Sequence, residues 1–152
     1  MRLNGLNSRK SIGTDMDKTI LAIDDEKSML AFYAVALAEF GIVRTAENLH
    51  DARMQLDGVD LIVLDFNLEH DLERFQDIVP ELKKTAPVLL CSGIQELEVP
   101  VMGVGLGIAG YWNKGSDHEM LRSLVRSILK PGTAAAQLNT GFNVRKPRGS
   151  TE

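Results

Sequence analysis

One short stretch, Ile20-Leu21-Ala22-Ile23-Asp24-Asp25-Glu26, decides how the rest of the sequence is read. Its first four residues are all apolar, and such a run indicates a strand that is buried on both faces of a parallel sheet. Acidic residues follow at once, and residues 26–40 then carry apolar side chains over most of a helical surface. A buried strand that leads through carboxylates into a helix is the first unit of an alternating α/β fold.

The same alternation of strand and helix continues along the chain. Further strands are predicted at 42–46, 61–64, 87–91 and 108–113, and helices at 26–40, 48–56, 71–84, 95–106 and 116–129. Gly41 ends the first helix, and Asn48 and Ser116 are the predicted N-caps of two others. Pro80 is expected to interrupt or restart the third helix. Five strands that alternate with helices predict a doubly wound parallel sheet with helices on both faces.

The composition limits the class of protein. The chain has 152 residues, 44% of them apolar and 25% charged, and a formal net charge of −4, which suits one folded domain. Its mild acidity offers no basic surface for nucleic acid, and no apolar run approaches the roughly 18 residues of a membrane span. Cys91 is the only cysteine, which excludes an intrachain disulfide. We therefore expect a cytoplasmic protein that binds neither nucleic acid nor membrane directly.

The two ends of the chain differ in composition from its middle. Residues 1–17 are rich in Asn, Ser and Gly, and residues 131–152 hold two Pro, three Gly and a run of three Ala. Neither end carries enough apolar residues to build a core, so both are predicted to be flexible tails around one domain at 18–130. Because the last segment is too short for an output domain, we expect a stand-alone domain that signals through protein contacts.

Polar side chains stand at the ends of four predicted strands. Asp24 and Asp25 follow the first strand, Asp65 ends the third, Ser92 follows the fourth and Lys114 follows the fifth. Each one alone has an ordinary explanation, such as a helix cap, a turn residue or a solvated charge. Because the carboxyl ends of parallel strands border one crevice, we expect these side chains to converge there.

The convergent residues suit phosphoryl transfer. Carboxylates that lie close together raise one another's pKa unless a cation lies between them, and Mg²⁺ prefers such oxygen ligands. An ionised Asp65 could then attack phosphorus as a nucleophile and form an acyl phosphate. The metal, the Lys114 ammonium and the Ser92 hydroxyl could neutralise the phosphoryl oxygens. The residues therefore predict Mg²⁺-dependent phosphorylation of Asp65.

Four motifs carry a family resemblance: ILAIDDE at 20–26, LIVLDFN at 61–67, PVLLCSG at 87–93 and AGYWNK at 109–114. In this order and at these distances they resemble the receiver domain of two-component response regulators, over residues 18–130. The resemblance implies the flavodoxin-like receiver fold, a five-stranded parallel sheet with strand order 2-1-3-4-5.

The resemblance also implies roles for the site residues. Asp65 is then the phosphoacceptor, and Asp24 and Asp25 hold Mg²⁺ together with Asp65 and the backbone carbonyl of Asn67. Lys114 falls at the lysine that contacts the phosphoryl group. A sensor histidine kinase or a phosphotransfer protein would supply that group. The protein would catalyse only its own phosphorylation and dephosphorylation, so it is not expected to be an enzyme with an outside substrate.

A switch is implied by two further positions. Ser92 falls at the family's phosphate-contacting hydroxyl, and Tyr111 falls at its switch aromatic. A phosphoryl group draws a hydroxyl toward itself, which can change the rotamer that a neighbouring aromatic prefers. Tyr111 can equally be read as a half-buried strand aromatic. The 95–130 face, with its apolar and glycine-containing segment at 100–106, is expected to bind a downstream protein or a second copy, although simple packing also explains that segment.

The sequence departs from the family pattern in two loops. Leu68 is followed by Glu69-His70-Asp71-Leu72 without the usual Pro and Gly, so this loop is expected to be shorter and more acidic. Gly115 stands where the family commonly has Pro, which makes the loop around Lys114 more pliant. These departures keep open a phosphorylation-independent interaction module with the same fold. An aspartyl phosphatase is a third interpretation, but Asn67 stands where its general acid would be.

Overall fold

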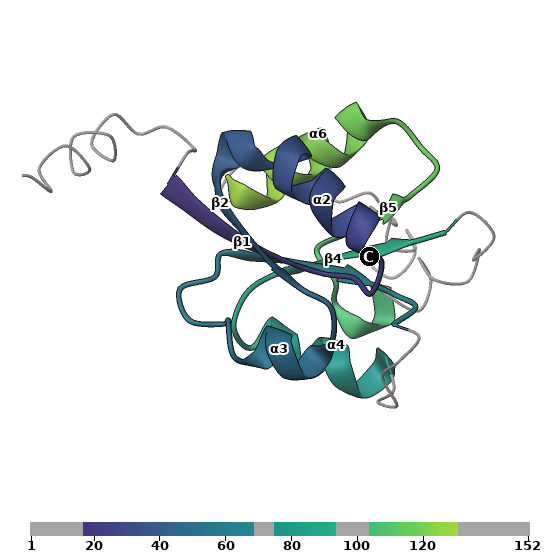
Figure 1. Cartoon of the computed structure of the whole chain (residues 1–152). Coiled ribbons are helices and arrows are strands. Elements are labelled where there is room, and N and C mark those ends of the chain that lie inside the picture. The colour runs from purple at the N-terminus through teal and green to yellow at the C-terminus, as the bar shows by residue number, and fades with distance from the viewer. Residues whose placement is uncertain (1–16, 69–74, 94–103, 131–152) are drawn as a thin grey trace, which may run out of the picture.

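The computed structural model of the chain describes residues 17–68, 75–93 and 104–130. Its elements are β1 (Lys18–Ile23), α2 (Lys27–Ala36), η2 (Ala38–Phe40), β2 (Gly41–Ala46), α3 (Leu49–Arg53), β3 (Leu61–Asp65), α4 (Phe75–Lys83), β4 (Val88–Ser92), β5 (Gly110–Asn113) and α6 (His118–Leu129). The strands form one parallel sheet in the order β2-β1-β3-β4-β5, which confirms the predicted fold and strand order. In Figure 1, α2 and α6 cover one face of the sheet and α3 and α4 cover the other.

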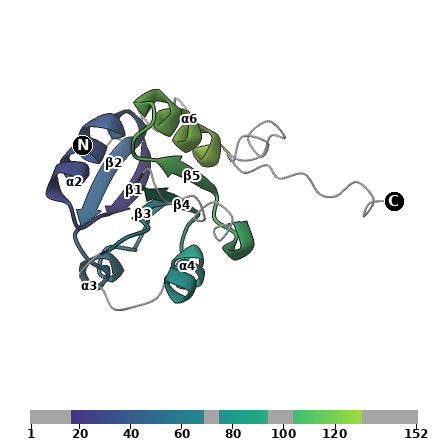
Figure 2. The same ribbon diagram turned by 90° about the vertical axis from the view of Figure 1, so that its right-hand side faces the viewer.

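Each face of the sheet has its own apolar core, and Figure 2 shows the same layers from the side. Ile20 and Ala22 of β1 pack on the face of α2 and α6, whereas Leu21 and Ile23 pack on the face of α3 and α4. β3 and β4 are buried at every position, as their continuous apolar runs predicted. Because β3 has no polar side chain before Asp65, its chemistry is confined to its carboxyl end.

Two helices differ from their predicted extents. α2 ends at Ala36, and a 3₁₀ turn at Ala38–Phe40 replaces the rest of the predicted helix. Gly41 still terminates this segment, because its φ of 137° lies in a region that favours glycine. The predicted interruption at Pro80 is wrong, since α4 runs through this residue. Proline has no backbone N–H, so the carbonyl of Gln76, four residues earlier, receives no helical hydrogen bond. Both residues are exposed, and water can donate to this carbonyl instead.

Of the two predicted N-caps, one is confirmed and one is wrong. Asn48 caps α3 as predicted, because its side chain accepts a hydrogen bond from a backbone N–H in the first turn. The cap of α6 is Asp117, whose carboxylate accepts a hydrogen bond from the backbone N–H of Glu119. Ser116 is not the cap, because its hydroxyl donates to the carbonyl of Asn113 and closes the turn after β5.

Some expectations concern residues outside the described ranges: both predicted tails apart from residue 17, the loop at 69–72 and most of the helix predicted at 95–106. Of that helix, residues 104–106 form a helical turn that Gly107 ends. Among the helices in the described ranges, none combines the length and the apolar character that a bilayer crossing requires.

Gly107 and Gly58 allow a matched test of whether Lys83 stabilises the turn at 104–107, before β5. Gly107 and Gly58 have nearly the same φ, 78° and 77°, which costs other residues about 1–2 kcal/mol. A Cβ at Gly107 would also collide with the ammonium of Lys83, which donates a hydrogen bond to the Leu106 carbonyl at 3.2 Å. Nothing lies within 4 Å of a Cβ at Gly58. In urea unfolding, Gly107→Ala should therefore lose up to about 1 kcal/mol more stability than Gly58→Ala. Equal losses would show that Lys83 contributes nothing.

Candidate functional site

The carboxyl ends of four strands bring the predicted polar residues together. Asp24 follows β1, Asp65 ends β3, Ser92 ends β4 and Lys114 follows β5. One oxygen each from Asp24, Asp25 and Asp65 lies within 4.8 Å of the others. The backbone N–H of Lys114 donates to the carbonyl of Ser92 at 2.8 Å, which extends the pairing of β4 and β5 into the site. The crevice is therefore built by the register of the sheet.

Lys114 brings a positive charge into this cluster. Its Nζ lies 2.8 Å from Oδ2 of Asp24 and 2.9 Å from Oδ1 of Asp65. Both carboxylates are buried, with exposed fractions of 0% for Asp24 and 5% for Asp65. A buried carboxylate needs a counter-charge, and one ammonium here serves two of them. The predicted pliancy of the loop at Gly115 therefore does not keep Lys114 from the carboxylates.

The pKa values follow from burial and from these contacts. Burial raises the pKa of Asp65 to about 6, and the negative charge of Asp24 also raises it. The hydrogen bonds from Lys114 and from the backbone of Asn67 lower this pKa, but they do not outweigh burial. Burial alone would lower the pKa of Lys114, but its contacts with Asp24 and Asp65 outweigh burial and raise that pKa. Lys114 is therefore charged at neutral pH, and an additional cation would favour the ionised form of Asp65.

The acidic cluster has a donor set that fits Mg²⁺. Oδ1 of Asp24 accepts a hydrogen bond from the backbone N–H of Glu26 at 2.9 Å. Oδ2 of Asp24 is buried and accepts no well-aligned hydrogen bond, although it is close to Lys114. A carboxylate oxygen has two lone pairs, so Oδ2 could bind a second cation beside Lys114, and Mg²⁺ prefers carboxylate oxygens together with several waters. Asp24, half-buried Asp25 and Asp65 are therefore suitable ligands.

The two residues of the predicted switch are in contact. Oγ of Ser92 and the hydroxyl of Tyr111 lie 2.9 Å apart and share a hydrogen bond. Ser92 is fully buried, whereas Tyr111 is half-buried and packs against the core of α3 and α4. Because Ser92 ends β4 beside the acidic cluster, a change in its hydrogen bonding would reach Tyr111 directly.

Two buried side chains beneath the site were not identified from the sequence. Cys91 pairs in register with Asp65, and Tyr33 of α2 packs in the same core as Cys91. Burial raises the pKa of Cys91 to about 12 and also raises that of Tyr33, so both are neutral. The Tyr33 hydroxyl faces Cys91 and has no nitrogen or oxygen partner among the described residues. Helical spacing marks Tyr33 as a core residue, but nothing in the sequence places it under Asp65.

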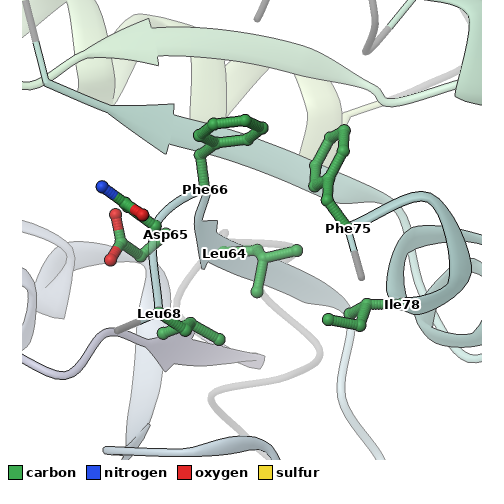
Figure 3. Close-up of a pocket in the computed structure, with 7 residues that line it drawn as sticks. Leu64, Asp65, Phe66, Leu68, Phe75 and Ile78 are labelled. Carbon is green, nitrogen blue, oxygen red and sulfur yellow. The ribbon is translucent and has the colours of Figure 1, made fainter. Parts of the chain in front are cut away.

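A cavity of about 180 Å³ adjoins Asp65 on the α4 side of β3 (Figure 3). Its walls are Leu64, Asp65, Phe66, Asn67, Leu68, Phe75 and Ile78. The rings of Phe66 and Phe75 meet edge to face, with their centroids 4.8 Å apart. Asp65 and Asn67 stand among these apolar side chains, and polar atoms form most of the surface that the pocket exposes. No sequence pattern indicates this pocket, because it depends on how α4 packs against β3.

The comparisons with known proteins agree with this geometry. No known protein-family profile matches the chain. The transcriptional regulatory protein CusR of Escherichia coli (strain K12) is 33% identical over 131 residues, which cover 82% of this chain and 56% of CusR. The same protein of Escherichia coli O6:H1 matches equally. The chain therefore spans little more than half the length of the curated relatives that it matches.

Solved structures show the same fold. The receiver domain of NtrX from Brucella abortus superimposes with a TM-score of 0.69 at 24% identity, over 74% of this chain and 99% of that domain. A response regulator receiver domain protein from Clostridium thermocellum gives a TM-score of 0.65 at 21% identity, over 75% of this chain and 95% of that one. Sequence relatives and structural neighbours therefore agree: the chain is similar in sequence to CusR and has the fold of the receiver domains of response regulators.

Proposed function

We propose that this receiver domain accepts a phosphoryl group on Asp65, in a Mg²⁺-dependent reaction, from a sensor histidine kinase or a phosphotransfer protein. The observation that carries the proposal is the position of the Lys114 ammonium, 2.8 Å from Asp24 and 2.9 Å from Asp65. An ammonium fixed beside a buried carboxylate nucleophile is placed to bind the oxygens of an incoming phosphoryl group.

The residues present can perform each step of the transfer. An ionised oxygen of Asp65 attacks the phosphorus, and the P–N bond of the donor phosphohistidine breaks with its electron pair passing to the imidazole. The Lys114 ammonium and the Ser92 hydroxyl stabilise the negative phosphoryl oxygens. Later attack of water on the phosphorus returns the free carboxylate and releases phosphate. No outside substrate is turned over, so we propose that the protein is not an enzyme in the ordinary sense.

The metal would be held by oxygen atoms around Asp65. Asp24, Asp25, Asp65 and the backbone carbonyl of Asn67 are the proposed ligands. Bound there, Mg²⁺ supplies positive charge for the phosphoryl oxygens. Oδ1 of Asp24 accepts from the backbone of Glu26 and Oδ2 lies against the Lys114 ammonium, so the orientation of this carboxylate is fixed before a metal binds.

The output is proposed to pass from Ser92 through Tyr111 to the 95–130 face. When the Ser92 hydroxyl turns to the phosphoryl group, its hydrogen bond with Tyr111 is lost, which frees the aromatic ring to change rotamer. The partner is proposed to be a downstream protein or a second copy of the chain. CusR is named as a transcriptional regulatory protein, but the match covers only 56% of it, so no contact with DNA is proposed here. We place the protein in the cytoplasm.

A phosphorylation-independent interaction module is the second candidate function. It is favoured by the same lysine, because Lys114 already gives two of the buried carboxylates a counter-charge without a metal. In that case the site would be a structural ion-pair cluster, and the surface would act without a switch. The two candidates differ in whether Asp65 reacts.

Intact-mass measurement distinguishes them. With Mg²⁺ and acetyl phosphate, the wild type should gain one phosphoryl group, and Asp65→Asn should gain none because the amide is not a nucleophile. Asp57→Asn, which removes an exposed carboxylate in a turn, should be phosphorylated like the wild type. If the folded wild type gains no mass, the proposed function is wrong and the interaction module remains.

The raised pKa of Asp65 predicts a pH-dependent stability. The folded pKa of about 6 lies above the ordinary value of 3.8, so the metal-free fold loses stability as the pH rises through this range. Asp65→Asn removes this cost and should be more stable than the wild type by about 1–3 kcal/mol at about pH 8. The difference should shrink toward pH 4. Urea unfolding with a chelator measures it, with Asp57→Asn as the control, and a pH-independent difference would contradict the assignment.

The switch predicts a response of Tyr111 that depends on Ser92. In NMR spectra, the ring signals of Tyr111 should shift when the wild type is phosphorylated with Mg²⁺ and acetyl phosphate. In Ser92→Ala the shift should be much smaller, because no hydroxyl connects the phosphoryl group to the ring. Ser123→Ala, which alters an exposed serine of α6, should respond like the wild type. An equal shift in Ser92→Ala would exclude this route.

A further inference from the structure

We propose that Asn113 is a positioning residue that holds the Lys114 ammonium where it can bind a phosphoryl group. The ammonium lies 2.8 Å from Asp24 and 2.9 Å from Asp65, so a small displacement of the lysine would weaken both contacts. Lys114 stands just outside β5, and Gly115 beside it has no side chain that could anchor the connecting segment. Other groups must therefore hold the lysine in place. This inference rests on the proposed function, which gives Lys114 its role.

Asn113 closes two turns around Lys114. Its Oδ1 accepts a hydrogen bond from the backbone N–H of Gly115 at 2.8 Å, which makes Lys114 the central residue of an Asx turn. Its carbonyl accepts a hydrogen bond from the backbone N–H of Ser116 at 2.9 Å, which places Lys114 and Gly115 at the central positions of a β-turn. The Ser116 hydroxyl donates to the same carbonyl at 2.7 Å. The backbone of Lys114 is therefore enclosed by hydrogen bonds that all end on Asn113.

Both flanks of this double turn are attached to the core. On one side, Asn113 pairs in register with Ser92, and the backbone N–H of Lys114 donates to the Ser92 carbonyl at 2.8 Å. On the other side, the indole N–H of buried Trp112 donates to the carbonyl of Asp117 at 3.2 Å. Because both flanks are tied, the remaining freedom of Lys114 lies within the turns that Asn113 closes.

The side chain of Asn113 can be removed without disturbing the sheet. The β-turn uses the backbone carbonyl, which every residue has, whereas the bond to Oδ1 depends on the side chain. Alanine removes this bond, and serine can restore it more weakly through its hydroxyl. Gly115 is exposed, so its N–H can turn to water when the bond is lost. We therefore expect Asn113→Ala to fold with Lys114 less well placed.

The first experiment locates Lys114 without metal or phosphodonor, by limited acetylation with acetic anhydride and peptide mass spectrometry. In the wild type Lys114 should react slowly, because two carboxylates hold its ammonium and its side chain is only 17% exposed. Asn113→Ala should raise this rate several-fold, and Asn113→Ser should restore most of the protection. Lys84, which is exposed after α4, should react equally in all three proteins. Equal rates at Lys114 in the folded wild type and Asn113→Ala would overturn the proposal.

Phosphorylation kinetics measure the consequence for transfer. With Mg²⁺ and saturating acetyl phosphate, Asn113→Ala should react about tenfold more slowly than the wild type, because misplacement of a reacting group lowers the rate. Asn113→Ser should recover most of this loss. Asn113→Ala should cause no additional loss in a Lys114→Ala background, because Asn113 acts only through the lysine. A further loss there would indicate a general structural role and would overturn the proposal.

Amide hydrogen exchange of the wild type gives a test that needs no variant. Gly115 is exposed, so protection of its N–H has to come from the bond to Asn113 rather than from burial. Its exchange should be slower than in an unstructured peptide of the same sequence. Exchange as fast as in that peptide would overturn the proposal even if Asn113→Ala did not fold.

Failure of this proposal and failure of the proposed function are distinguishable. If the wild type gains no phosphoryl group, the proposed function fails and the role in transfer fails with it, while acetylation still shows whether Asn113 holds Lys114. If the wild type is phosphorylated but Lys114 reacts equally with and without the Asn113 side chain, only the positioning role fails.

Discussion

The contact of one ammonium with two buried carboxylates is the constraint on which this site depends. Asp24 and Asp65 are removed from water, and isolation of an ionised carboxylate in a low dielectric is too costly to persist without a partner. Lys114 provides that partner to both. Because its own backbone is tied to the carbonyl of Ser92, the position of the ammonium follows from the pairing of β4 with β5. The charge balance of the site therefore depends on the register of the sheet.

The sheet explains why the polar groups gather at one edge. β3 and β4 contact apolar cores on both faces, so a polar side chain within them would lose water without gaining a partner. The last residue of each strand is the first position where this restriction ends. Parallel strands place these positions side by side, which is why Asp65 and Ser92 share a crevice. Burial of the strands and convergence of the site residues therefore have the same cause.

This cause also explains what the sequence could reveal. Continuous apolar runs and the polar residues after them are visible in a sequence, so the strands and the residues of the crevice could be predicted. The order of the strands was implied by the resemblance of four motifs to receiver domains. The cap of α6 could not, because Ser116 and Asp117 are both good caps and the choice depends on the bond from Ser116 to Asn113. Neither Tyr33 beneath Asp65 nor the cavity at Phe75 could be predicted, since both depend on how helices pack across the sheet.

The two side chains beneath the carboxylates are uncharged, so they do not contribute to the charge balance of the site. Cys91 and Tyr33 lie below the carboxylates and stay protonated, because burial raises both of their pKa values. They can therefore neither add to the negative charge nor offset it. Lys114 supplies one positive charge against the three carboxylates of the cluster. Of the three carboxylates, only Asp25 is half-buried rather than buried, so a cation and a phosphodonor would both approach from the side on which it lies.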